Sequence, residues 1–190
     1  MASEVGICNR ALQKLGASSI LSLTEDSTEG RACNLAYKPV RDALLRSHWW
    51  SFSIKRASLA ASSTSPLFGY DNQFPLPSDY LKLVPPDHRE KVYMTDWKLE
   101  DGFIRTNDDA PLEIRYVSRV TDPNKFDALF IEALSARLAM EMCEQLTQSN
   151  AKRQLAMQEY QDSIREARKH NAFENPPVEA PDGSWITSRL

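Results

Sequence analysis

Apolar residues recur at helical spacing in both end portions of this 190-residue chain, and that spacing is absent from the middle. Helical and strand periods differ, so a chain divided this way combines two kinds of structure. The sequence predicts an α+β protein that is mainly α. Two helical hairpins, 1–57 and 123–171, are expected to pack as a four-helix bundle, because neither apolar stripe is covered otherwise. A small antiparallel β subdomain, 58–122, is inserted between them, and 172–190 form an extended C-terminal arm.

The N-terminal hairpin has recognisable helix signals. Ser3 is a favourable N-cap and Gly16 a favourable stop for the first helix. The second helix is expected over 27–48, where Pro39 predicts either a kink or a break near Tyr37. The apolar stripe of the second helix is expected at Ala32, Leu35, Ala36, Val40, Ala43 and Leu44.

Three large aromatic residues, Trp49, Trp50 and Phe52, follow the second helix. One interpretation is that they fill the core at the helix end, because aromatic side chains bury a large area. The other is that Trp49 and Trp50 anchor a contact with another subunit, because Trp is enriched in interface hot spots. The sequence favours the core interpretation and leaves the second open.

The middle of the chain alternates short apolar runs with turn-forming residues. The segment 60–66 is a loop by composition, and Glu100-Asp101-Gly102 predicts a hairpin turn. Strands are expected at 80–84, 91–93, 97–99, 103–106 and 112–117.

The C-terminal hairpin is expected to begin at Asp122-Pro123, an N-cap followed by a preferred first helical residue. A break is predicted at 147–150, and a last helix over 151–171. The outer face of that helix carries charges of both signs that nearly cancel, so it is interpreted as a solvated face.

The arm contains three prolines that exclude a helix, and it carries Trp185 close to its end. A lone Trp in a polar extension either folds back on its own domain or docks on a neighbour, and we favour the neighbour. The predicted residues of partner or subunit contact are Trp185, Ile186, Arg189, Leu190, Trp49 and Trp50.

No catalytic, metal-ligating or cofactor-binding residues are expected. The sequence lacks a nucleophile elbow and a phosphate-binding glycine loop. The cysteines Cys8, Cys33 and Cys143 are interpreted as reduced core residues. The histidines have no metal-ligand spacing; they are His48, His88 and His170.

A carboxylate-dependent hydrolase is the enzymatic alternative. It requires two carboxylates held across a groove, one of them desolvated. The acidic residues that cluster in the sequence are Asp96, Glu100, Asp101, Asp108 and Asp109. They fall at predicted turns, where Asp is favoured for backbone reasons, so catalysis is disfavoured.

Charge and hydropathy restrict the partners. The net charge of −3 includes no segment basic enough for tight DNA binding. No apolar run approaches the length of a membrane helix, and the first residues predict no signal peptide. We therefore expect at most passive contact with nucleic acid, and no membrane partner.

Several segments in order resemble the tail tubular protein A family of podophages, which are adaptor proteins below the portal. A helix leading into Trp49-Trp50-Ser51-Phe52 and a basic pair within 30–59 is similar to the family's first signature, although Trp50 replaces an expected small polar residue. Further similar segments are 67–70, 74–81, the closing helix with Tyr160 and 167–171, and the Trp-containing 184–189.

This resemblance implies a structural adaptor in the virion tail, assembled in the host cytoplasm. It implies a homo-oligomeric ring, expected to be a dodecamer, that connects the portal protein to the tail nozzle or tube and lines the DNA ejection channel. The alternatives are a tail-associated cell-wall hydrolase that depends on carboxylates, and a generic helical protein-binding module.

Overall fold

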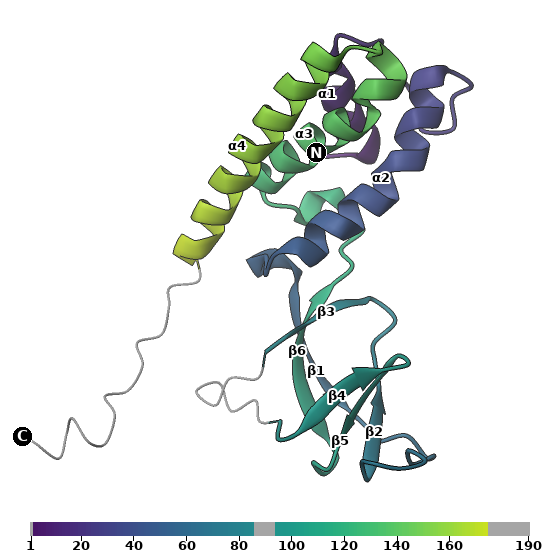
Figure 1. Ribbon diagram of the computed structural model, residues 1–190, viewed down its shortest axis with the longest axis vertical. Helices are drawn as coiled ribbons and strands as arrows, with labels where there is room; N and C mark the ends of the chain where they lie inside the picture. The colour runs from purple at the N-terminus through teal and green to yellow at the C-terminus, as the bar shows by residue number, and fades with distance from the viewer. Residues whose placement is uncertain (1, 86–93, 175–190) are drawn as a thin grey trace, which may run out of the picture.

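The computed structural model describes residues 2–85 and 94–174. This described chain is a mixed α+β protein with four α-helices and two antiparallel three-stranded sheets (Figure 1). The helices gather at one end of an elongated molecule and the sheets at the other. The predicted α+β class is confirmed.

Helix α3 is the centre of the helical part, and the other three helices all contact it. It is also the most apolar helix, with a buried side that includes Leu134, Leu138 and Met142. Helix α1 packs mainly on α3 and has only a small contact with α2, so the first two helices are joined chiefly through α3. The four helices are α1 (Glu4–Leu15), α2 (Thr28–Ser47), α3 (Ala128–Thr147) and α4 (Asn150–Glu174).

Both ends of α1 follow the predicted signals, and α2 begins close to the expected residue. The Ser3 hydroxyl accepts a hydrogen bond from the Gly6 backbone N–H at 3.0 Å. Gly16 ends α1 in the left-handed region, with φ at 68°. Ser27 caps α2 by accepting from the Gly30 N–H at 3.0 Å. These interactions satisfy backbone groups that a helix leaves unpaired at its ends.

The buried face of α2 differs from the predicted stripe. The helix continues through Pro39, so the predicted alternative of a break near Tyr37 is wrong. Leu35 and Ala43 are exposed, whereas Tyr37 and Arg41 are buried. The face that meets the core is therefore rotated around the helix, toward the Tyr37 ring and the paired Arg41 guanidinium, which the predicted stripe did not include.

The start of α3 and the end of α4 differ from the predicted boundaries. Asp122 caps a short 3-10 turn, Pro123–Lys125, rather than α3. The cap of α3 is Asp127, whose carboxylate accepts from the backbone N–H groups of the next turn. Helix α4 continues to Glu174, so 172–174 belong to a helix and not to the predicted arm.

The first sheet has strand order β1-β6-β3 and the second β2-β5-β4. The first comprises β1 (Ile54–Leu59), β3 (Tyr80–Val84) and β6 (Leu112–Ser118). The second comprises β2 (Asn72–Pro75), β4 (Trp97–Glu100) and β5 (Phe103–Thr106). Four predicted strands are confirmed, and the fifth, 91–93, lies outside the described residues. Strands β1 and β2 were not predicted, and β1 begins before the expected boundary at residue 57.

Strand β6 connects two apolar cores. Val117, near its end, belongs to the main core formed with the helices. Leu112, Ile114 and Tyr116 belong to a second core between the sheets, together with Phe74. One strand thus contributes buried side chains to both parts of the molecule.

Candidate contact surfaces

The predicted aromatic residues Trp49 and Trp50 lie where α2 ends and the chain turns into β1. The Trp50 side chain is 1% exposed, and its indole N–H donates to the Leu44 carbonyl at 3.1 Å. Its ring packs edge-on against Phe130, with centroids 5.1 Å apart, and near Phe52 at 6.2 Å. Trp50 therefore fills the core and offers no surface to a partner, which corrects its predicted contact role.

Trp49 remains accessible. Its side chain is 43% exposed, and the Lys82 ammonium lies 5.4 Å from its ring centroid. Its backbone carbonyl accepts a hydrogen bond from the Asn171 amide at 3.0 Å. Backbone and ring are thus both held, and part of an aromatic surface still faces outward. The remaining predicted contact residues lie outside the described residues: Trp185, Ile186, Arg189 and Leu190.

The sequence analysis missed an apolar pair at the sheet end. Leu67 and Phe68 are 98% and 85% exposed in the connection from β1 to β2. That connection lies at the end of the molecule opposite α1 (Figure 1). The signal was present: two bulky apolar residues stand between Pro66 and Gly69 in an otherwise polar loop, where no strand pattern accounts for them.

Other large apolar side chains are exposed on the helical part. Leu21 is 94% exposed in the connection from α1 to α2. Further exposed residues lie on α2 and α4, namely Leu35, Leu155, Met157 and Phe173. Single exposed apolar residues are ordinary, but clusters mark contact sites. The adjacent pair Leu67-Phe68 is thus a candidate contact surface at the sheet end, and Leu21 is a single exposed residue at the helical end.

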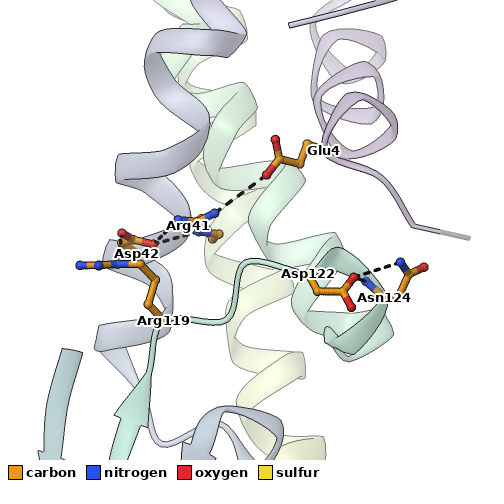
Figure 2. A network of polar contacts seen from close by, with 6 residues as sticks. All are labelled: Glu4, Arg41, Asp42, Arg119, Asp122 and Asn124. Carbon is orange, nitrogen blue, oxygen red and sulfur yellow. Dashed lines mark hydrogen bonds and ion pairs between the residues drawn. The ribbon is translucent and has the colours of Figure 1, made fainter. Parts of the chain in front are cut away.

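A polar network joins the helices to the first sheet (Figure 2). Arg41 on α2 is 4% exposed and makes two contacts with the neighbouring Asp42 carboxylate, at 2.8 and 2.9 Å. Glu4 on α1 lies 4.0 Å from the same guanidinium. Asp42 also accepts from Arg119, just after β6, at 2.9 Å. The network ties α1, α2 and the end of β6 together.

The acidic residues considered for hydrolysis support turns instead. The Asp108 carboxylate accepts from the Thr95 backbone N–H and hydroxyl, at 2.9 and 2.6 Å, and from the Thr106 hydroxyl at 2.8 Å. Desolvation raises the pKa of Asp108, but these hydrogen bonds outweigh it and hold the pKa below its usual value. A low pKa suits a structural acceptor and not a proton donor.

Two further acidic residues of this set, Glu100 and Asp96, are also hydrogen-bonded. Glu100 accepts from Arg105 at 2.8 Å across the β4–β5 hairpin. Asp96 accepts from the Tyr70 hydroxyl at 3.3 Å. Both contacts are exposed, so neither carboxylate has the desolvated setting that a general acid needs.

The described residues contain no group of three or more His, Cys, Asp or Glu side chains arranged to hold a metal ion. An open groove of about 850 Å³ lies along α1. Its lining includes Asn9, Arg10 and Gln13. Within 2–85 and 94–174, no helix combines the length and apolarity needed to cross a membrane.

No protein family model matches this chain, and no curated protein matches it. Its function is therefore inferred from the residues and the geometry above.

Proposed function

We propose that this chain is a structural adaptor of a tailed bacteriophage that forms a homo-oligomeric ring between the portal and the tail nozzle or tube. The observation that supports this most is the exposure of large apolar side chains at both ends of an elongated molecule, at Leu21 and at Leu67-Phe68. A ring held between two partners needs a contact surface at each end. The adjacent pair Leu67-Phe68 supplies an apolar surface at one end, and Leu21 supplies an exposed apolar side chain at the other.

Lateral contacts would close the ring. Helices α2 and α4 lie on opposite flanks of the helical part (Figure 1). Leu35 is exposed on α2, and Leu155 and Met157 are exposed on α4. Different surfaces on two flanks suit a head-to-tail contact, which generates a closed ring when the rotation between copies permits. In this proposal the helices act as a four-helix bundle of two hairpins, and each bundle packs against its neighbours.

The charge of the chain suits a channel through which DNA passes. The net charge is −3, so a ring of many copies carries no excess of positive charge that would retain DNA. Contact with DNA is then passive. The proposed location is the virion tail, with the host cytoplasm as the site of assembly.

The hydrolase alternative is less well supported. Asp108, Asp96 and Glu100 each serve as acceptors for neighbouring turns or strands, and none is placed in a desolvated groove. Degradation of purified cell wall by the full chain would favour a hydrolase nonetheless. The alternative of a generic helical protein-binding module differs from the adaptor in one observable respect: a generic module is not expected to form a ring.

Electron microscopy of the full chain, alone and mixed with the portal protein of the phage that encodes it, tests the proposal. We expect rings bound to one end of the portal. A chain that stays monomeric and unbound in the presence of portal contradicts the adaptor function and favours the generic module.

Trp185→Ala tests the predicted arm. Assembly onto the portal is expected to weaken, because a Trp anchor in an interface contributes about 2 kcal/mol or more. The circular dichroism spectrum and the melting temperature of the unassembled chain should remain those of the wild type. Unchanged assembly would remove the arm from the interface.

A further inference from the structure

The last turns of α4 are bound to the segment between α2 and β1 through one side chain, Asn171. Its amide oxygen accepts from the Ser51 backbone N–H and the Ser51 hydroxyl, both at 2.8 Å. Its amide nitrogen donates to the Trp49 carbonyl at 3.0 Å and lies 3.2 Å from His48 Nε2. These contacts join residues about 120 positions apart in the chain.

Two backbone groups determine the orientation of the Asn171 amide. The Ser51 N–H can only donate, and the Trp49 carbonyl can only accept. Reversing the amide would place donor against donor at Ser51 and acceptor against acceptor at Trp49. The NH₂ group therefore faces His48 Nε2, and that nitrogen must act as an acceptor. His48 consequently has to be neutral, with its proton on Nδ1, for all the contacts to form.

The surroundings of His48 also oppose a positive charge. Desolvation by burial lowers its pKa, and Arg168 on α4 and Lys82 on β3 lower it further. These two cations are the charged side chains of the described chain that act on the ring. The ring of Trp50 packs edge-on beside the imidazole, with centroids 4.9 Å apart. A proton on Nε2 would thus face an NH₂ group and find two cations nearby.

We propose that His48 and Asn171 form an acid-sensitive latch that releases the C-terminal turns of α4 from residues 48–51 when His48 gains a proton. Trp49, the predicted contact residue that is exposed within the described chain, loses its carbonyl partner when the latch opens. The latch therefore couples acidity to a candidate contact surface. It depends only on the described fold and stands whether or not the chain is a phage adaptor.

The direction of the effect follows from proton linkage. The closed latch binds fewer protons than the open one, because only neutral His48 accepts from Asn171. Above the ordinary histidine pKa of 6.5 the latch has its full stability. As the pH falls below that value, the open-to-closed ratio rises, approaching tenfold per pH unit, until the lowered pKa of the closed form is reached.

Amide hydrogen exchange of the full chain, followed by NMR between about pH 7.5 and about pH 5, tests the latch. The Ser51 N–H is the reporter, and its exchange is expressed as a protection factor to remove the intrinsic pH effect. The Gln148 N–H, which donates to the Glu144 backbone carbonyl at 3.1 Å at the C-terminal end of α3, is the internal control. We expect Ser51 protection to fall by up to about tenfold per pH unit while Gln148 protection stays constant.

The same spectra report the His48 imidazole, which should titrate below 6.5. Equal pH dependence of Ser51 and Gln148 protection would overturn the proposal. So would titration of His48 at 6.5 or above.

Two variants distinguish opening of the latch from unfolding of the whole chain at low pH. His48→Phe keeps an aromatic ring beside Trp50 but removes the acceptor nitrogen, so Ser51 protection should no longer depend on pH. His170→Phe changes an exposed histidine on α4, next to Asn171, and should keep the wild-type dependence. The opposite result for either variant contradicts the latch.

Asn171→Asp provides a test that does not need His48→Phe to fold. A carboxylate accepts from protonated His48, so the His48 pKa should move above 6.5 and Ser51 protection at about pH 5 should exceed that of the wild type. A His48 pKa that stays below 6.5 in Asn171→Asp would overturn the proposed contact.

Discussion

At the scale of single residues, Asp42 is the carboxylate that pairs with a buried arginine, Arg41. Arg41 is almost fully buried, and its remaining partners are Glu4 at 4.0 Å and the face of the Tyr37 ring, 5.8 Å from the guanidinium carbon. Asp42 supplies both close contacts to Arg41 and one to Arg119. Burying a guanidinium without its carboxylate partner strongly lowers the stability of the fold, whereas exposed ion pairs contribute little to it.

Asp42→Ala is therefore expected to lower the free energy of unfolding by roughly 3 kcal/mol, because Arg41 stays buried without a close partner. Asp162→Ala is the matched control. It removes the i,i+3 pair with Arg165, in which both side chains are more than half exposed, and should cost less than about 0.5 kcal/mol. Urea denaturation measures both values. Equal losses would mean that Arg41 finds another partner or reaches water.

Asp79 makes a second residue-scale prediction, for acid stability. Desolvation raises its pKa, but hydrogen bonds from Lys55 at 2.6 Å and Tyr116 at 2.9 Å outweigh it, and the pKa lies below the usual value of 3.8. Stability from these contacts is complete above 3.8 and is lost as the pH falls through the lowered pKa of the folded state. Asp79→Asn should therefore lose less unfolding free energy than the wild type between about pH 5 and about pH 2. Thermal melts over that range check this; parallel curves would contradict it.

At the scale of elements, local signals and tertiary burial contribute differently. The ends of α1 and the start of α2 were predictable, because capping depends on residues three or four positions apart. Strand β1 was not predictable, because its sequence Ile-Lys-Arg-Ala-Ser-Leu shows only a weak alternation. It is a strand because it pairs with β6 along its whole length, from Ile54 with Val117 to Leu59 with Leu112.

The orientation of α2 yields a prediction with an internal control. Leu45 is fully buried in the main core and Leu35 is 77% exposed, although both are leucines on one helix. Leu45→Ala should destabilise the fold by about 2–5 kcal/mol, through lost burial and the cavity left behind. Leu35→Ala should change stability by less than about 0.5 kcal/mol in the unassembled chain. Chemical denaturation of the two variants distinguishes this orientation from the stripe predicted from sequence, which placed Leu35 inward.

At the scale of the whole molecule, the apolar surfaces at the two ends matter most. Leu67 and Phe68 are 98% and 85% exposed and so contribute little packing to their own chain, and the β1–β2 connection that carries them lies at the sheet end of the molecule (Figure 1). Their exposure has a cost in solubility, and a contact with another protein would offset it. The proposed ring with a partner on each side accounts for a surface at this end.

The double variant Leu67→Ser with Phe68→Ser should keep the wild-type melting temperature and lose affinity for one of the two proposed partners, portal or nozzle, by at least about tenfold. Ser63→Ala with Ser65→Ala, at exposed positions of the same connection, is the control and should bind both partners normally. Sedimentation of the mixtures provides the measurement. Unchanged binding to both partners would exclude the sheet end as a contact surface.

The sequence by itself determined what depends on residues close along the chain: the caps of α1, the hairpin turn between β4 and β5, and the division into helical and strand segments. Only the tertiary structure decided which of two adjacent tryptophans is buried, which side of α2 meets the core, and that Asn171 lies against His48. The physical reason is that backbone geometry responds to residues a few positions away. Burial and hydrogen bonding depend instead on groups that folding brings together from distant parts of the chain.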